Sequence, residues 1–159
     1  MLKEFTDQLQ AFGRLDVMGV AGEVFQEAAQ VAAEAVVIGN AFGPGAPLDT
    51  GFLRASFRVA KNAPEDGPSE RPPVPGRKDG DAPLYPTTLD TSAAQTAALG
   101  DRIYCTTVAE YADSLEEGGL TRRNGPPENV GAPTQFVAPV EARWLQIVDD
   151  AARRVGYGR

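Results

Sequence analysis

Apolar residues recur at intervals of three and four along the first quarter of the chain, which is the spacing of helices with one buried face. The first run consists of Leu2, Phe5, Leu9 and Phe12 and ends before Gly13. A second run begins after Asp16, a suitable N-cap, and consists of Val17, Val20, Val24, Ala28, Val31, Ala35 and Ile38. Gly39 then supplies a C-terminal stop. The pattern predicts a short helix followed by a helix of about six turns.

Shorter patterns follow this helical region. Residues 53–55 predict one helical turn, which Asp49 or Thr50 can cap with a side-chain oxygen. Phe57 and Val59 then alternate with neighbours that are charged or small, as in a strand with one buried face. This segment therefore joins the long helix to the first predicted strand.

The second half of the chain contains one further strand pattern and three helical ones. A helix of small residues is predicted over 92–99. Residues 101–108 are rich in β-branched and aromatic types and predict a strand with Cys105 buried in it. Helical spacing returns over 108–115 and in the tail, where we expect one amphipathic helix anchored by Trp144. The apolar positions of that tail helix are Val137, Val140, Trp144, Ile147 or Val148, Ala151 and Val155.

Residues 62–89 interrupt these elements with prolines, glycines and charges. Such a composition buries little apolar surface, so we expect an extended flexible loop within a single domain of residues 1–159. The predicted fold class is α+β. In it, N-terminal and C-terminal amphipathic helices pack on a small, mostly antiparallel β-sheet.

Composition narrows the classes of function. The net charge of −7 comes without a basic cluster, which disfavours a surface that grips nucleic acid. No stretch approaches the ~20 apolar residues of a membrane span, and the first residues lack the apolar core of a signal peptide. We therefore expect a protein that makes no membrane contact and is made in the cytoplasm.

Candidate chemistry is sparse. There is no histidine, and the single Cys105 allows neither an internal disulfide nor a zinc cluster. The acidic residues Glu110, Asp113, Glu116 and Glu117 could suggest a metal site, but they lack the spacing of a calcium loop and fit a solvated helix face better. We expect no catalytic residue, no metal and no cofactor.

The tripeptide Asp49-Thr50-Gly51 is shared with the catalytic loop of aspartic proteases, so a dimeric protease is one alternative. That mechanism needs two carboxylates sharing one proton, each placed by a rigid strand. Here the preceding residues are rich in glycine and proline, and Arg54 would favour the ionised form of a nearby carboxylate. The helical periodicity also disagrees with a protease built almost entirely of strands.

Three segments, in this order, resemble motifs of a family of phage tail-completion, or head–tail joining, proteins. The first is Pro47–Phe57, which reads PLDTGFLRASF. The second is Tyr111–Gly118, which reads YADSLEEG, and the third is Thr134–Val140, which reads TQFVAPV. Their order and relative spacing agree with those of the family over roughly residues 15–155.

The resemblance implies a structural virion protein of a tailed phage, not an enzyme. It would form a homo-oligomeric ring at the neck, a hexamer by resemblance, that completes the tail and joins it to the head. The implied partners are further copies of itself, head-side connector or adaptor proteins and the tail tube protein, while DNA only passes through the lumen. A head-side connector or stopper ring is an alternative within the same class.

The resemblance also implies which residues shape the subunit or its interfaces. Asp49 would cap a turn, Gly51 would allow a close backbone approach, and Arg54 would pair with a carboxylate in the same or a neighbouring subunit. The full set is Asp49, Thr50, Gly51, Leu53, Arg54, Tyr111, Ala112, Glu116, Gly118, Phe136 and Pro139. An acidic lumen would repel the phosphate backbone and let DNA pass.

Overall fold

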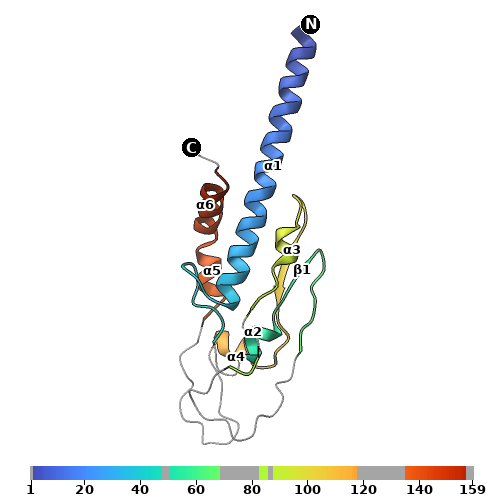
Figure 1. Ribbon diagram of the computed structural model, residues 1–159. Coiled ribbons are helices and arrows are strands. Elements are labelled where there is room, and N and C mark those ends of the chain that lie inside the picture. The colour runs from blue at the N-terminus through green and yellow to red at the C-terminus, as the bar shows by residue number, and fades with distance from the viewer. Residues whose placement is uncertain (1, 48–50, 69–82, 86–87, 118–134, 157–159) are drawn as a thin grey trace, which may run out of the picture.

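The computed structural model describes residues 2–47, 51–68, 83–85, 88–117 and 135–156, with side chains from Val17 onward. Its dominant element is helix α1 (Leu2–Val37), which extends well beyond the rest of the chain (Figure 1). The predicted break at Gly13 and the new start at Asp16 are therefore wrong. A glycine inside a helix costs only about 1 kcal/mol relative to alanine, which by itself does not end a helix.

Helix α1 ends where the sequence predicts. Gly39 has a φ of 96°, and the backbone N–H groups of Ile38 and Gly39 both donate to the carbonyl oxygen of Glu34. The side chain of Asn40 also donates to the carbonyl oxygen of Val31, 3.0 Å away. A left-handed glycine with such bonds satisfies carbonyls that the helix end leaves open.

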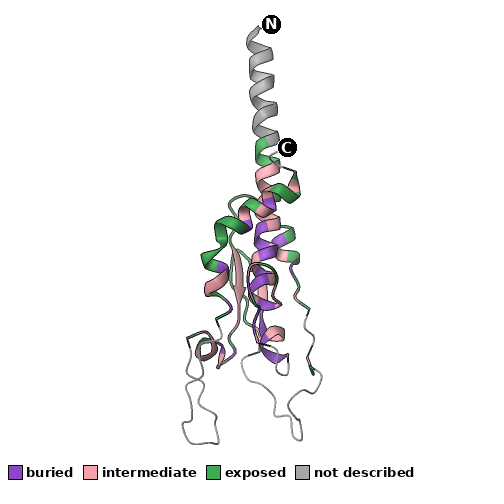
Figure 2. Cartoon of the chain, turned by 90° about the vertical axis from the view of Figure 1, so that its left-hand side faces the viewer, coloured by how far each residue is buried: buried purple, intermediate pink, exposed green. Residues whose placement is uncertain are grey.

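Where its side chains are described, from Val17 onward, α1 is buried mainly toward its C-terminal end (Figure 2). Ala28, Val31 and Ala35 belong to a buried cluster with residues of the C-terminal helices. By contrast, Val17 is 61% exposed and Met18 is 58% exposed. The predicted apolar stripe is thus buried in its second half and exposed at its start.

Helix α2 (Phe52–Ser56) leads into the sheet, whose two strands are β1 (Arg58–Lys61) and β2 (Ile103–Thr106). They pair antiparallel, with Arg58 opposite Thr106 and Lys61 opposite Ile103. Phe57, just before β1, is buried, but within the strand Ala60 is the buried residue and Val59 is half-buried. The predicted buried face at Val59 is therefore wrong, because Phe57 lies in the connection and not in the ladder.

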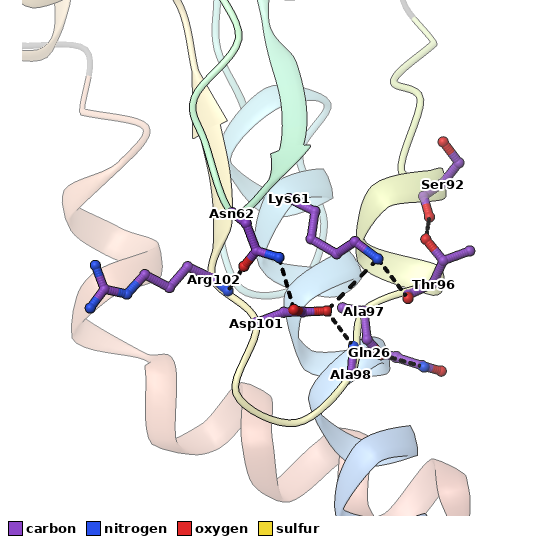
Figure 3. Close-up of polar contacts among 9 residues, drawn as sticks. All are labelled: Gln26, Lys61, Asn62, Ser92, Thr96, Ala97, Ala98, Asp101 and Arg102. Atoms are coloured by element: carbon purple, nitrogen blue, oxygen red, sulfur yellow. Dashed lines mark hydrogen bonds and ion pairs between the residues drawn. The ribbon is translucent and has the colours of Figure 1, made fainter.

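A polar cluster ties the ends of the two strands together (Figure 3). Asp101 accepts hydrogen bonds from the Ala98 backbone N–H at 2.8 Å and from the Asn62 side chain at 2.9 Å, and its carboxylate lies 3.8 Å from Lys61 Nζ. Asn62 in turn accepts from the backbone N–H of Arg102. These backbone and side-chain hydrogen bonds hold the pKa of Asp101 below its ordinary value. The cluster fixes the strand ends although a long segment separates them in sequence.

Helix α3 (Ser92–Gln95) is shorter than predicted and lies between the two strands in sequence. After β2 come α4 (Ala112–Glu117), α5 (Ala138–Ala142) and α6 (Trp144–Val155). The tail thus forms two helices instead of one. Its anchors are Ile147 and Ala151, both fully buried, whereas Trp144 is 42% exposed. The predicted role of Trp144 as anchor is wrong.

The architecture is α+β, as predicted, with helices from both ends of the chain packed on a small antiparallel sheet. Helices α5 and α6 lie on one side of α1, while α3 and the sheet lie on the other (Figure 1). None of the helices in the described part of the chain is long and apolar enough to cross a membrane.

Candidate functional site

The three motif segments meet in one buried cluster. The members that come from the motif segments, which we call the motif cluster, are Phe52, Leu53, Phe57, Ala112 and Phe136. The rings of Phe57 and Phe136 lie edge to face with centroids 6.2 Å apart, and those of Phe52 and Tyr111 lie 6.4 Å apart. Segments separated by more than fifty residues in sequence therefore share one core, and aromatic pairs of this kind add stability beyond their buried area.

Glu116 connects the second and third motif segments directly. Its carboxylate accepts hydrogen bonds from the backbone N–H groups of Phe136 at 2.8 Å, Val137 at 3.1 Å and Ala138 at 3.0 Å. Helix α5 has no side-chain cap from its own N-cap residue, so the carboxylate from α4 takes that role. Burial by itself would raise the pKa of Glu116, but the three N–H donors together outweigh it and lower the pKa.

Gly51 sets the start of α2. Its φ of 85° lies in the left-handed region, and it occupies the N-cap position without a side-chain cap. A Cβ added at this position would lie 2.9 Å from the carbonyl oxygen of Tyr85, which is too close. Tyr85 in turn packs edge to face on Phe52, with centroids 5.5 Å apart. Glycine therefore permits the close approach of two chain segments at this corner.

Arg54 and Ser56 make polar contacts on opposite sides of α2. Arg54 Nε donates to the carbonyl oxygen of Ala46 at 2.8 Å, and partial burial lowers the pKa of its guanidinium group. Arg54 thus holds the segment before α2 through a carbonyl, and its pairing with a carboxylate, in the same or a neighbouring subunit, stays a prediction. Ser56 is fully buried, donates to the carbonyl oxygen of Leu53 and shares a 2.7 Å hydrogen bond with Thr107.

The remaining predicted residues divide between described and undescribed positions. Leu53 and Ala112 are buried, and Pro139 lies in the first turn of α5, where its missing N–H costs nothing. Asp49, Thr50 and Gly118 lie outside the described residues, so the capping role of Asp49 and its use as a protease carboxylate both stay predictions.

The sequence analysis missed two residues, Ser56 and Thr107, that form a hydrogen bond beside the motif cluster. Ser56 belongs to the first motif segment but was not singled out, although its place between Ala55 and Phe57 in a largely apolar run was a usable signal. Its partner Thr107 follows β2 and carried no signal, because its role depends on the tertiary contact with Ser56.

The polar groups around the motif cluster serve to pack segments together and to cap helices. These carboxylate, guanidinium and hydroxyl groups bond chiefly to backbone atoms, which fixes segments in place. Burial raises the pKa of the Cys105 thiol to about 12, so it is protonated at neutral pH. Within the described residues, no group of three or more acidic or cysteine side chains is placed to hold a metal ion.

No protein-family model matches this sequence, and neither a curated protein nor a solved structure matches it.

Proposed function

We propose that the protein is a structural component of a tailed-phage virion, assembled as a homo-oligomeric ring at the neck. There it completes the tail and joins it to the head-side connector. The observation that carries the proposal is the meeting of all three motif segments in one cluster, braced by Glu116. Segments that resemble a single family and also pack on one another are expected if the resemblance reflects a shared subunit.

The polar contacts of the corner support a scaffolding role. Glu116 and Arg54 bond to backbone groups of another segment, and Ser56 bonds to the side chain of Thr107. These bonds fix α5 on α4 and fix α2 on the turn after α1 and on the segment after β2. A ring subunit needs such rigidity so that every copy presents the same surface. The net charge of −7 fits a lumen through which DNA passes without binding.

Native mass spectrometry of the purified protein, with electron microscopy of tails that lack it and are then supplied with it, tests the proposal. We expect a ring-sized complex, either free in solution or formed on the tails. The variant Glu116→Ala should bind tails more weakly than Glu117→Ala, because Glu117 is exposed and makes no described contact to α5.

Two other results would contradict the proposal in different ways. An obligate dimer that cleaves peptides in acid, and loses this activity on Asp49→Asn substitution, would favour the protease. A ring that binds head-side connectors but not tails would favour a connector or stopper ring.

A further inference from the structure

A half-open groove of about 460 Å³ runs beside α1, and two of its lining residues, Val36 and Cys105, also pack against the buried cluster that holds the motif residues. One wall is the α1 face formed by Phe25, Ala29, Ala32 and Val36, and the other is formed by residues 101–105, with Trp144 at one end. The alanines leave space next to the helix axis, so a second helix could approach closely. Trp144, which does not anchor its own helix, instead borders this groove.

The groove face continues along α1 toward its exposed half. Met18 and Gly22 precede Phe25, Ala29, Ala32 and Val36 at intervals of four, three, four, three and four, so all six share one side of the helix. Met18 is largely exposed, and a Cβ added at Gly22 would meet no atom within 4 Å. We call this side of the helix, from Met18 to Val36, the acceptor stripe; it is open at Met18 and recessed at the groove, where Ala29 is only 8% exposed. It is roughly 27 Å long.

The start of α1 offers a complementary segment. In the sequence, positions 2, 5, 9 and 12 are leucine or phenylalanine, and the segment before Val17 is helical. At about 100° per residue, these positions fall on the side of the helix opposite the acceptor stripe. The segment is roughly 22 Å long, which fits within the stripe. Large apolar positions on one side and small ones on the other are suited to a ridge entering a groove.

We propose that the acceptor stripe of each copy binds the N-terminal segment of α1 from a neighbouring copy. Because the two surfaces lie on opposite sides of the same helix, one copy cannot pair with another through a twofold axis at this contact. The contact is head to tail, and such contacts close into rings when the rotation between subunits allows it. The inference rests on the proposed ring and identifies the surface that builds it.

The size of the contact sets its strength. A helix segment roughly 22 Å long and 10 Å wide covers only about 200 Å² of its neighbour. A stable interface typically buries about 800 Å² per partner. The contact therefore supports a ring together with further surfaces and is weak between two isolated copies. We expect assembly to depend on protein concentration and to be cooperative on ring closure.

Two tryptophan variants test the inference with a matched control. Gly22→Trp places a large side chain in the acceptor stripe, whereas Gly19→Trp places the same side chain about 60° away on the same exposed part of α1. Neither glycine has a neighbour within 4 Å of an added Cβ, so both variants should fold, as circular dichroism would verify. We expect Gly22→Trp to raise the concentration needed for half-assembly by roughly tenfold or more, the scale of an interface hot spot. Gly19→Trp should change it much less.

Cysteine cross-linking provides a second measurement. A chain with Leu9→Cys, Gly22→Cys and Cys105→Ala, treated with a short bismaleimide, should form a ladder of covalent multimers, because each copy both donates and accepts. Products that stop at dimers would indicate a twofold contact and overturn the inference.

The outcomes separate this interface from the proposed function. Rings that form equally in both tryptophan variants, without a ladder, would overturn the interface and leave the ring. If Gly22→Trp forms normal rings but no longer binds tails, the occupant of the stripe is a tail or connector helix and not a second copy. A wild-type protein that is monomeric both in solution and on tails would overturn the proposed function itself.

Discussion

Glu116 shows how one side chain can organise distant parts of a small domain. Its carboxylate takes three backbone N–H donors at the start of α5, whose own N-cap residue, Val137, has no side chain that can do so. A charged acceptor on backbone donors is among the stronger hydrogen-bonding arrangements in proteins. A single side chain of α4 thus caps the start of α5.

Replacing Glu116 with alanine should lower the free energy of unfolding by about 1–2 kcal/mol, the usual cost of losing a helix cap. Glu117→Ala is the matched control, because Glu117 is exposed and its removal leaves the Glu116 cap intact. Urea unfolding followed by circular dichroism measures both. Equal stability of the two variants would mean that the carboxylate contributes nothing as a cap.

The same carboxylate should make stability depend on pH. The pKa of Glu116 is lower in the folded protein than its ordinary value of 4.5, so its contribution is complete above that value and is lost as the pH falls through the folded pKa. Asp90 and Asp101 have lowered pKa values too, so the comparison must be between variants. Unfolding free energy measured from pH 6 to pH 3 should fall less steeply in Glu116→Gln than in Glu117→Gln. Parallel curves would contradict this prediction.

Gly51 combines a left-handed backbone with a close neighbour, and the two effects can be separated. Gly51→Ala and Gly100→Ala both place a side chain at positive φ, which costs about 1–2 kcal/mol. Only at Gly51 does the added Cβ also lie 2.9 Å from a carbonyl oxygen, while Gly100 has open space. Thermal unfolding should therefore show a larger loss for Gly51→Ala, and a reversed order would argue against the close approach to Tyr85.

Among the elements, α6 best tests the difference between sequence and structure. Ile147 is fully buried against α1, whereas Trp144, the largest apolar side chain in the helix, lies at the groove. Ile147→Ala should cost roughly 2–4 kcal/mol of unfolding free energy, and Trp144→Ala clearly less. Chemical denaturation of the two variants measures this order. A larger loss of unfolding free energy for Trp144→Ala would mean that Trp144 anchors the helix, as its size suggested.

Local patterns predicted the elements whose causes are local. The end of α1 at Gly39, the turn of α2 and the strand around Cys105 follow from glycine geometry, helical spacing and β-branched residues. The continuity of α1 through Gly13 could not be predicted from these patterns, because a glycine penalty of about 1 kcal/mol does not by itself decide whether a helix ends. Nor could the capping of α5 by Glu116, since the spacing that made Glu116 look solvated says nothing about a segment that follows twenty residues later.

At the scale of the whole molecule, one half of α1 belongs to the core and the other half extends beyond it. Its C-terminal half packs between α6 on one side and α3 with the sheet on the other, and its N-terminal half extends past them (Figure 1). A 36-residue helix gains little by remaining unsupported in water, since most helical stability in proteins comes from packing. The proposed ring supplies that packing from a neighbouring copy.

The native Cys105 can serve as a probe of the proposed assembly, through its rate of labelling by a thiol reagent. It is largely buried and lines the groove, and its pKa of about 12 keeps the thiolate scarce at neutral pH. Labelling by a thiol reagent should therefore be slow, and a neighbouring helix lying over the groove should slow it further by covering the thiol. We expect the labelling rate, followed by mass spectrometry at pH 8, to fall as the protein concentration passes through the assembly midpoint. In Gly22→Trp the fall should shift to higher concentration together with the midpoint. A rate that stays constant while rings form would place the neighbouring subunit elsewhere on the surface.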